Sequence, residues 1–463
     1  MIKSMLTNTD AAETVEWPTL PAKRAAPSPW IWLPYIWLFI ASTRALSSWL
    51  SIGVGSDTPD LEADVSGSFL DRTVLQGLMA LGLVVLGRRA ERTKTILARN
   101  KWLVMLFIYM GLSVLWSNFP AISLRRWFRL LGTLIMALVA LTEQSPLEAL
   151  RALFRRLYLL HIPLSIITIK YFRNIGVAWS RDGSEVSWVG LAVHKNNLGQ
   201  VAMCSGLVST WQVLQNWSRK KLTVDLALLV LTLWVLRGPP TARSSTSIIG
   251  FIVGALVLFG LQPMRKRPGK VVRGARILGA VAVVALAVMP VFEAIEWNPL
   301  EVVVESSGRD MTFTGRTGLW KDVLNNAAKN PVLGVGIGAF WVGPIGYAMY
   351  PLENWSRVTP RWRPGQGHNG YVDVCVDLGA IGILLVVIVI GYAFAGALAD
   401  FKKNFELGRL RLTLLVSIVL NNITESSLLK GTHSLWFLFL LVAINVPTKK
   451  VTGCDRRAEI LER

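Results

Sequence analysis

The sequence predicts an all-α, polytopic membrane protein, and its composition and hydrophobic pattern carry that prediction. Of the 463 residues, 52% are hydrophobic and only 17% are charged, and 19 are tryptophans. A soluble globular chain of this length has a smaller apolar share and more charge. Long apolar runs recur along the chain, and in lipid such runs form helices because each segment must satisfy its own backbone polar groups.

The chain is predicted to cross the membrane about 12 times as one integral domain, residues 29–447. Several runs fall short of the roughly 20 residues that one crossing requires. The third and fourth runs, and the last two, can also be read as re-entrant hairpins. The predicted spans are residues 29–49, 69–87, 102–117, 127–142, 157–171, 197–216, 222–236, 245–262, 277–293, 371–399, 410–429 and 433–447.

The distribution of lysine and arginine predicts that both chain ends lie in the cytoplasm. With that orientation the densest cation groups, at 88–101 and 265–276, fall on the inner side, as does the basic tail at 448–463. The first external loop has only acidic charges, and residues 1–28 form a cytoplasmic tail. Further inner cations are Arg219, Lys220, Lys221, Lys402, Lys403, Arg409 and Arg411.

Charge, cysteine and histidine content exclude several classes of function. The net charge of +20 would suggest nucleic acid in a soluble chain, but here the cations flank apolar spans, where insertion and anionic lipid explain them. The three cysteines include no external pair for a disulfide. The four histidines form no close group with cysteine or carboxylate on the external side, so we expect no metal ligated by the protein and no cofactor.

The polar segment 294–370 is the longest predicted external loop and the expected place for chemistry. It contains Arg316, at the opening of a helical stretch, and it ends with His368 directly before the next apolar span. Between them, Asn330-Pro331 and several glycines predict a stop and a turn. The loop therefore offers one arginine and one histidine at a membrane surface.

Several separate motifs follow one another along the chain and together cover roughly residues 100 to 445. The motifs are Leu115 to Pro120 with Ser123 to Arg126, His194 to Asn196 with Leu198-Gly199, the segment after Arg243, Gly315 to Thr317 with Trp320, Asn330-Pro331 with Gly334 and Gly336, His368 to Tyr371 with Asp377 to Gly382, and Asn421 to Ser426. In this order and spacing they resemble the O-antigen ligase and O-antigen/exopolysaccharide polymerase family of bacterial membrane glycosyltransferases. The stretch before Arg125 is closer to the exopolysaccharide polymerases.

The resemblance implies a GT-C-like membrane fold and transfer of a glycan from undecaprenyl diphosphate to a sugar hydroxyl. The reaction would take place on the periplasmic face of the bacterial inner membrane, with inversion at the anomeric carbon. The acceptor would be another lipid-linked chain or a lipid A core, as in lipopolysaccharide assembly. Membrane lipids and other polysaccharide assembly proteins are the further partners expected.

The resemblance also assigns three residues to catalysis. Arg316 and Arg243 match the family's arginines and would stabilise the diphosphate as negative charge develops on it. The stretch before Arg243, Pro239 to Ala242, departs from the serine-led run usual in the family. His368 matches the family's histidine and would accept the proton of the attacking hydroxyl, which a largely neutral imidazole can do.

Five more residues are expected at the substrate site: Arg181, Lys195, Glu425, Trp320 and Asn369. Arg181 and Lys195 would contact phosphate or an anionic glycan, or else anchor the interface. Glu425, a carboxylate within an apolar span, would orient His368 or an arginine, or brace two helices. Asn369 would cap the helix beginning at Gly370. Either Asp373 or Asp377, one helical turn apart, would hydrogen-bond the imidazole or pack the helix.

Two other classes of function stay open from the sequence. A transporter or flippase for the same lipid-linked glycan also needs many spans and external cations, but it has no need of a histidine beside them. Such transporters often consist of two related halves, and no such repeat is visible here. A non-catalytic scaffold of a polysaccharide export complex would depend on no single external arginine or histidine. The sequence also does not separate polymerase from ligase.

Overall fold

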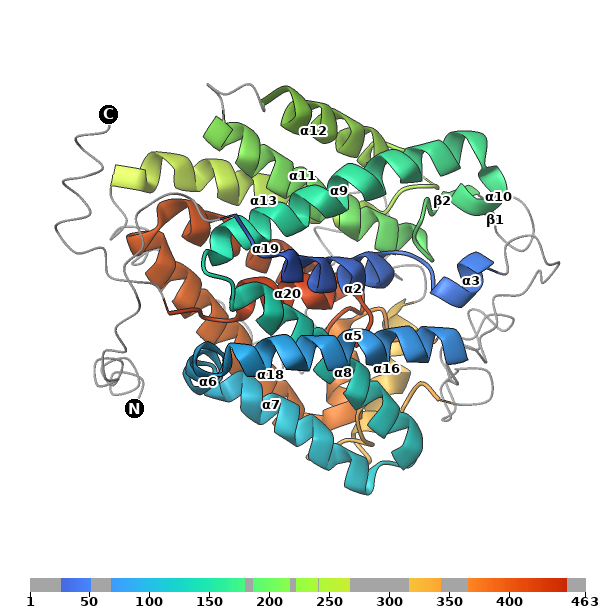
Figure 1. Cartoon of the computed structure of the whole chain (residues 1–463). Coiled ribbons are helices and arrows are strands. Elements are labelled where there is room, and N and C mark those ends of the chain that lie inside the picture. Colours follow the sequence, from blue (N-terminus) through green and yellow to red (C-terminus); the bar gives the residue numbers. More distant parts are fainter. Residues whose placement is uncertain are drawn as a thin grey trace, which may run out of the picture.

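The computed structural model describes residues 26–50, 68–179, 186–216, 222–239, 241–266, 316–342 and 365–447. These residues are mostly helical, in long helices that run side by side (Figure 1). The longer elements are α2 (Trp32–Ser42), α3 (Leu46–Leu50), α5 (Phe69–Arg88), α6 (Ala90–Arg99), α7 (Lys101–Leu112), α8 (Pro120–Leu141), α9 (Pro146–Tyr171), α11 (Lys195–Asn216), α12 (Leu222–Leu236), α13 (Ser245–Leu261), α16 (Arg316–Ala327), α18 (Gly370–Lys403), α19 (Phe405–Thr424) and α20 (Ser434–Ala443).

The short elements lie at the ends of the long helices. The helical turns are η1 (Pro29–Ile31), η2 (Ser113–Trp116), α10 (Arg173–Gly176) and η3 (Gln262–Lys266). One antiparallel hairpin, β1 (Val177–Trp179) with β2 (Val186–Trp188), pairs Val177 with Trp188. The sequence analysis did not foresee this hairpin, which is a small addition to an otherwise all-α fold.

The apolar runs form helices wherever they fall in the described residues, while the number of crossings stays a prediction. Five described helices are long and apolar enough to span a bilayer: α5, α9, α13 with η3, α18 and α19. The bent pair of α6 with α7 and η2, whose angle is 89°, would make six. The predicted span at 277–293, most of the loop 294–370 and both predicted tails apart from residues 26–28 lie outside the described residues.

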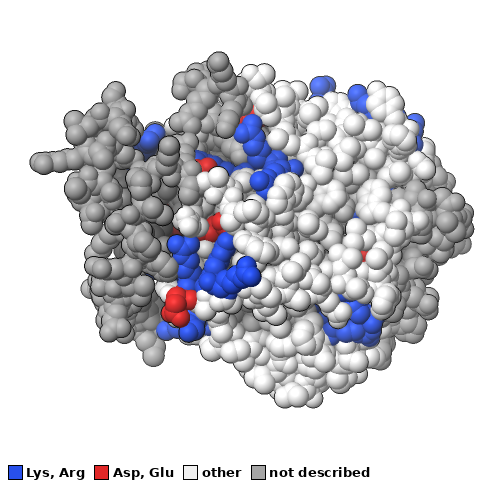
Figure 2. All heavy atoms as spheres, in the orientation of Figure 1, with Lys and Arg blue, Asp and Glu red and all other residues white. Residues whose placement is uncertain are grey.

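The outward faces of several long helices are apolar, as a lipid environment requires. Leu83 of α5, Val230 of α12 and Leu256 of α13 are 55%, 64% and 67% exposed in mid-helix. On the face shown in Figure 2, charged side chains are confined to separate patches on a mostly uncharged surface. An exposed apolar surface of this kind marks contact with a membrane rather than with water.

The interior of the bundle is built around α20, whose residues are all buried. It packs against α8, α18 and α19, and α19 also lies along α13. Close approach of α13 and α19 depends on small residues, since the Ser417 hydroxyl donates to the Gly250 carbonyl at 3.0 Å. Buried hydroxyl contacts of this kind are typical of helix pairs in membranes.

One end of the bundle carries buried charge pairs where α18 ends and α19 begins. Arg411 donates to Asp400 and to Asn445, and Arg409 donates to Glu406 at 2.7 Å. Both arginines, counted above among the inner cations, are buried, at 3% and 0% exposure. They lie within α19, which begins at Phe405, and carboxylate and carbonyl partners within the bundle compensate the buried charge.

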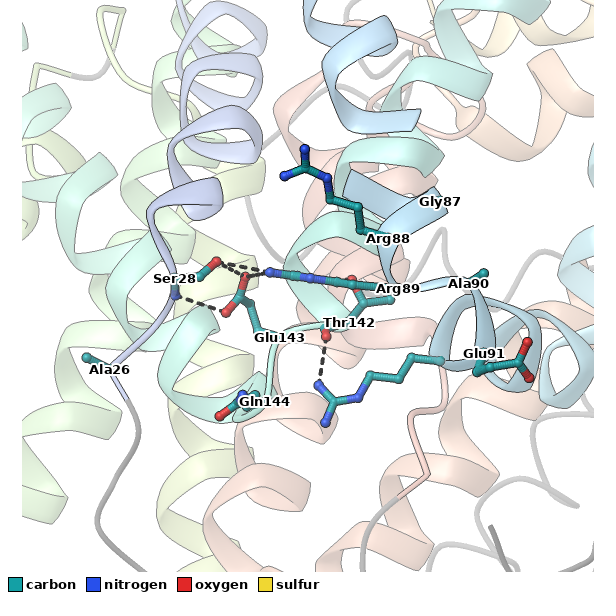
Figure 3. A pocket seen from close by; sticks show the side chains of 11 residues that line it. Ala26, Ser28, Gly87, Arg88, Arg89, Ala90, Glu91, Thr142, Glu143 and Gln144 are labelled. Carbon is teal, nitrogen blue, oxygen red and sulfur yellow. Dashed lines mark hydrogen bonds and ion pairs between the residues drawn. The ribbon is translucent and has the colours of Figure 1, made fainter. Parts of the chain in front are cut away.

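The same end has a pocket that joins the segment before η1 to α5, α6 and α8 (Figure 3). Glu143 accepts from the backbone amide of Ser28 at 3.0 Å and pairs with Arg89 at 2.7 Å. Arg92 donates to the Thr142 carbonyl at 3.1 Å. These contacts hold the segment before η1 against the end of the bundle that we predict to be cytoplasmic.

Candidate active site

His368 lies in a short loop that leads into α18, at the other end of the bundle. Asn369 has extended dihedrals, and its Oδ1 accepts from the amides of Tyr371 and Val372 at 3.0 and 3.2 Å. The expected capping role of Asn369 is therefore observed. His368 itself has a φ of +49°, which non-glycine residues rarely adopt. Such a conformation persists only where surrounding contacts enforce it.

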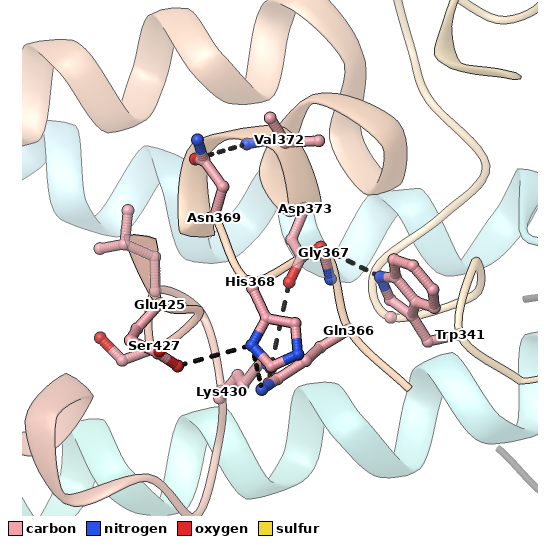
Figure 4. Close-up of polar contacts among 12 residues, drawn as sticks. Trp341, Gln366, Gly367, His368, Asn369, Val372, Asp373, Glu425, Ser427 and Lys430 are labelled. Atoms are coloured by element: carbon pink, nitrogen blue, oxygen red, sulfur yellow. Dashed lines mark hydrogen bonds and ion pairs between the residues drawn. The ribbon is translucent and has the colours of Figure 1, made fainter. Parts of the chain in front are cut away.

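The imidazole of His368 faces Glu425 and Gln366 (Figure 4). Its Nδ1 atom lies 3.6 Å from Glu425 Oε2 and 3.4 Å from Gln366 Nε2. The two side chains of the ion pair are 12% and 4% exposed, so solvent screens the contact little. The other carboxylate oxygen of Glu425 accepts from Asn196 Nδ2 at 2.5 Å. Among the roles left open for Glu425, the structure favours facing His368.

Glu425 is not part of a transmembrane helix, contrary to the sequence analysis. Helix α19 ends at Thr424, and Glu425 is extended, with φ −140° and ψ 157°. The helix ends there because Asn422 Oδ1 accepts from the amides of Ser427 and Leu428 and so stabilises a turn. The Glu425 carbonyl then accepts from the amide of Gly370 at 3.1 Å, which joins the end of α19 to the start of α18.

Helix α16 packs against α18 beside the histidine loop. The indole of Trp320 donates to the Gly367 carbonyl at 2.7 Å, so Trp320 supports the loop that carries His368. Arg316 is the first residue of α16, about one helical turn before Trp320. Its backbone therefore lies on the same side of the molecule as His368. The Arg316 side chain is outside the described part of the chain.

Asp373 and Asp377 hold backbone rather than the imidazole in the contacts observed. Asp373 Oδ1 accepts from the Trp341 indole at 3.1 Å and from the Gly367 amide at 2.9 Å. Asp377 accepts from the amides of Gly338 and Phe340 at 3.0 and 3.3 Å. The two aspartates thus fix the turn that follows α16 and the loop that carries His368.

The predicted stop after Asn330-Pro331 is a glycine turn that docks on a break in α18. Gly379 interrupts α18 with a φ of +62°, and the Ala380 amide donates to the Pro331 carbonyl at 2.8 Å. Arg126 donates to the carbonyls of Gly338 and Trp341. Arg126, the last residue of one of the family motifs, thus holds this turn.

Lys195 is the first residue of α11, and Arg243 lies just before the start of α13. Lys195 Nζ donates to the Thr241 carbonyl at 3.0 Å, and Thr424 at the end of α19 donates to Thr246 in the first turn of α13 at 2.9 Å. Arg243 precedes α13, and its Nε atom is buried with no hydrogen-bond partner among the described residues. The start of α13 is thereby adjacent to the end of α19, where Glu425 follows.

Two residues at the centre of the site were missed by the sequence analysis. Lys430 donates to Gln366 Oε1 and lies 3.9 Å from Asp373 Oδ2. Desolvation lowers the pKa of Lys430, and Asp373 opposes that shift. Two sequence signals could have indicated these residues. Lys430 is a lone cation between two apolar runs, and Gln366 lies two residues before His368.

Not every expected site residue can be placed. Arg181 lies outside the described residues. Within the described ranges, no group of three histidine, cysteine or carboxylate side chains is arranged to hold a metal ion. The expectation of no protein-ligated metal and no cofactor stays a prediction.

Comparison with known proteins shows what the part of the chain that carries this site resembles. The O-Antigen ligase family matches residues 226–387, which include Arg243, Arg316 and His368. Over these residues the chain is similar to the O-antigen ligases. It is also similar to the exopolysaccharide production protein ExoQ of Rhizobium meliloti (strain 1021), with 26% identity over 360 residues, 76% of this chain and 74% of that protein. The predicted family resemblance is confirmed, and it supports a membrane polysaccharide polymerase or ligase with glycosyltransferase-type activity.

Glu425, Lys430 and the start of α11 lie outside the matched domain. Lys430 and Glu425 nevertheless contact the loop that carries His368 directly, and Asn196 at the start of α11 contacts it through Glu425. The part of the chain that matches the O-antigen ligase family therefore depends on flanking segments to complete the surroundings of His368.

Proposed function

We propose that this protein is a bacterial inner-membrane glycosyltransferase that polymerises or ligates polysaccharide. It transfers a glycan from undecaprenyl diphosphate to a sugar hydroxyl on the periplasmic face, without a metal ion. Of the two reactions, polymerisation is favoured by the similarity to a protein of exopolysaccharide production. The finer assignments of donor, acceptor side and stereochemistry belong to this proposal.

The observation that carries the proposal is the meeting of five helix ends around His368. Asn196 at the start of α11 bonds Glu425, and Gly370 at the start of α18 bonds the same residue. Trp320 ties α16 to the loop, and the Thr424–Thr246 bond joins α19 to the start of α13. The proposed Arg243 and Arg316 thus belong to helix starts that converge on the histidine loop.

In the proposed reaction, the acceptor hydroxyl oxygen attacks the anomeric carbon as the bond to the diphosphate oxygen breaks. The bonding electron pair leaves with the diphosphate, and the hydroxyl proton passes to His368. Because Nδ1 faces Glu425 and Gln366, we assign proton transfer to Nε2. Glu425 then stabilises the imidazolium that forms, as a carboxylate beside a catalytic histidine does.

Arg243 and Arg316 are proposed to stabilise the leaving diphosphate. An arginine stays charged at any working pH and presents donors in a planar fork that fits phosphate. Arg316 and the first amides of α16 share one helix N-terminus, where the helix dipole also favours an anion. The buried Nε of Arg243 has an unused donor that a phosphate oxygen could satisfy. A single in-line displacement of this kind inverts the anomeric configuration.

Purified protein in liposomes tests the proposal directly. Supplied with undecaprenyl-diphosphate-linked repeat units, a chelator and no nucleotide sugar, the protein is expected to lengthen the glycan and release undecaprenyl diphosphate. Product chains are measured by gel electrophoresis and mass spectrometry. Transport of the lipid-linked unit across the bilayer with no longer product would contradict the proposal and favour a flippase.

A further inference from the structure

Nδ1 of His368 lies between a hydrogen-bond donor and a hydrogen-bond acceptor that make opposite demands on it. The Gln366 amide nitrogen, at 3.4 Å, can only donate and therefore needs an unprotonated Nδ1. The Glu425 carboxylate oxygen, at 3.6 Å, can only accept and therefore needs a proton on Nδ1. The contact that prevails decides which ring nitrogen of a neutral His368 carries the proton.

Lys430 decides the orientation of the Gln366 amide. An ammonium group only donates, so the amide atom that contacts Lys430 Nζ must be the oxygen, Oε1. The NH₂ group of the same amide then points to His368 Nδ1 (Figure 4). The direction of this amide, often ambiguous, is here fixed by chemistry. With Lys430 in place, the neutral imidazole carries its proton on Nε2.

An imidazole with its proton on Nε2 cannot accept another there, so this arrangement is inactive for the reaction proposed above. Lys430 is partly accessible, at 33% side-chain exposure, and its contact with Asp373 is long, at 3.9 Å. An incoming diphosphate offers the ammonium stronger acceptors than an amide oxygen does. Once Lys430 moves to the phosphate, Gln366 can turn, Nδ1 can take the proton and face Glu425, and Nε2 becomes a base.

We propose that Lys430 and Gln366 form a positioning relay that couples binding of the donor diphosphate to the tautomer of His368. The inference rests on the proposed function, and it names Lys430 as a phosphate-sensing residue rather than a catalytic one. The other charged or titratable groups around the relay come from two helices, α8 and α18, and from the connection between α19 and α20. They are Asp373 and Asp377 of α18, Arg126 of α8, Glu425 after α19 and His433 before α20.

Nitrogen NMR of ¹⁵N-histidine-labelled full-length protein in nanodiscs tests the relay without any assay of activity. The His368 signals are assigned by their loss in His368→Gln. In the unliganded wild type, Nδ1 is expected to give the signal of an unprotonated nitrogen and Nε2 that of an N–H. Adding undecaprenyl diphosphate should exchange the two. A wild type that already has Nδ1 protonated, or that does not change with undecaprenyl diphosphate, would overturn the proposal.

Variants separate the relay from a merely structural role. Lys430→Met and Gln366→Glu should each have Nδ1 protonated without ligand, because nothing then holds an NH₂ group toward it. Lys430→Arg keeps a donor and should retain the wild-type pattern. Lys329→Met is the matched control, since Lys329 also donates to a side-chain amide oxygen, that of Asn326, away from His368. An unchanged pattern in both Lys430→Met and Gln366→Glu would refute the relay while leaving the proposed glycosyl transfer untouched.

Discussion

At the scale of single residues, the chemistry depends on how His368 is held. Its backbone is in a left-handed conformation, at φ +49°. On one side, Gly367 is held by hydrogen bonds to Asp373 and Trp320. On the other side, Asn369 caps α18. These contacts aim the ring at Glu425. Placing a base and its carboxylate partner by rigid neighbours lowers the reorganisation needed in the reaction.

Replacement of Glu425 by glutamine is expected to lower the turnover of elongation by about 100-fold with little change in donor binding. The amide keeps the size of the side chain but removes the negative charge that stabilises the imidazolium formed in the reaction. The measurement is the elongation rate in liposomes, with donor binding measured in parallel.

Glu91→Gln is the control for that experiment, since Glu91 is 80% exposed on α6 at the far end of the bundle. It should leave the elongation rate and donor binding unchanged. A Glu425→Gln enzyme that elongates as fast as the wild type would remove Glu425 from the mechanism.

At the scale of elements, the break in α18 and the glycine turn after α16 position the histidine loop together. A Cβ on Gly379 would clash with the Val332 carbonyl oxygen, and the backbone there has a positive φ. Gly379 thus allows the turn to contact α18 and lets Asp377 bind the turn amides. Helix α18 can therefore serve both as a membrane helix and as the floor of the site.

Gly379→Ala is expected to destabilise the protein by about 1 to 3 kcal/mol, through strain and the close contact. Gly391→Ala in the same helix is the matched control, because a Cβ there meets nothing within 4 Å. It should be neutral or stabilising by up to about 1 kcal/mol. Thermal unfolding in detergent measures both. Equal melting temperatures for the two variants would show that the break is not required.

The sequence predicted the helices well and the ends of some of them poorly. Apolar period and length are local signals, so α5, α13 and the amphipathic α16 were recoverable from the chain alone. The end of α19 was not, because it depends on Asn422 binding amides of Ser427 and Leu428 in a turn. Burial of Arg411 depends equally on partners contributed by α18 and by the chain after α20, and burial of Arg409 depends on Gln262 of η3.

The site was predicted in part, for a similar reason. Asn369 as a cap and His368 beside a carboxylate followed from local pattern and family resemblance. Lys430 and Gln366 lie 64 residues apart, and their contact depends on the packing of loops. Nothing in the sequence near either residue points to the other.

At the scale of the whole molecule, the two ends of the bundle differ in kind. One end has buried ion pairs and the Ser28–Glu143–Arg89 contacts, and the other has the converging helix starts around His368. The distribution of cations predicts that the first end is cytoplasmic. The proposed reaction requires that the second end faces the periplasm, where the lipid-linked donor would be presented.

Single cysteines can determine this orientation. In a background with Cys204, Cys375 and Cys454 replaced by alanine, Val193→Cys should react with an impermeant maleimide added outside spheroplasts. Val193 is 63% exposed beside the start of α11. Glu91→Cys, at the opposite end, should react only after permeabilisation. The reverse labelling would place the proposed site in the cytoplasm and end the periplasmic mechanism.

The central claim is that His368 acts as the base while the arginines bind the diphosphate, and one paired measurement tests it most directly. Elongation and binding of the undecaprenyl-diphosphate-linked repeat unit are measured in parallel for His368→Ala and Arg316→Ala in liposomes. The account predicts that His368→Ala binds the donor nearly as the wild type does and elongates at least about 100-fold more slowly. Arg316→Ala should lose donor affinity as well. Elongation by His368→Ala at the wild-type rate would contradict the account.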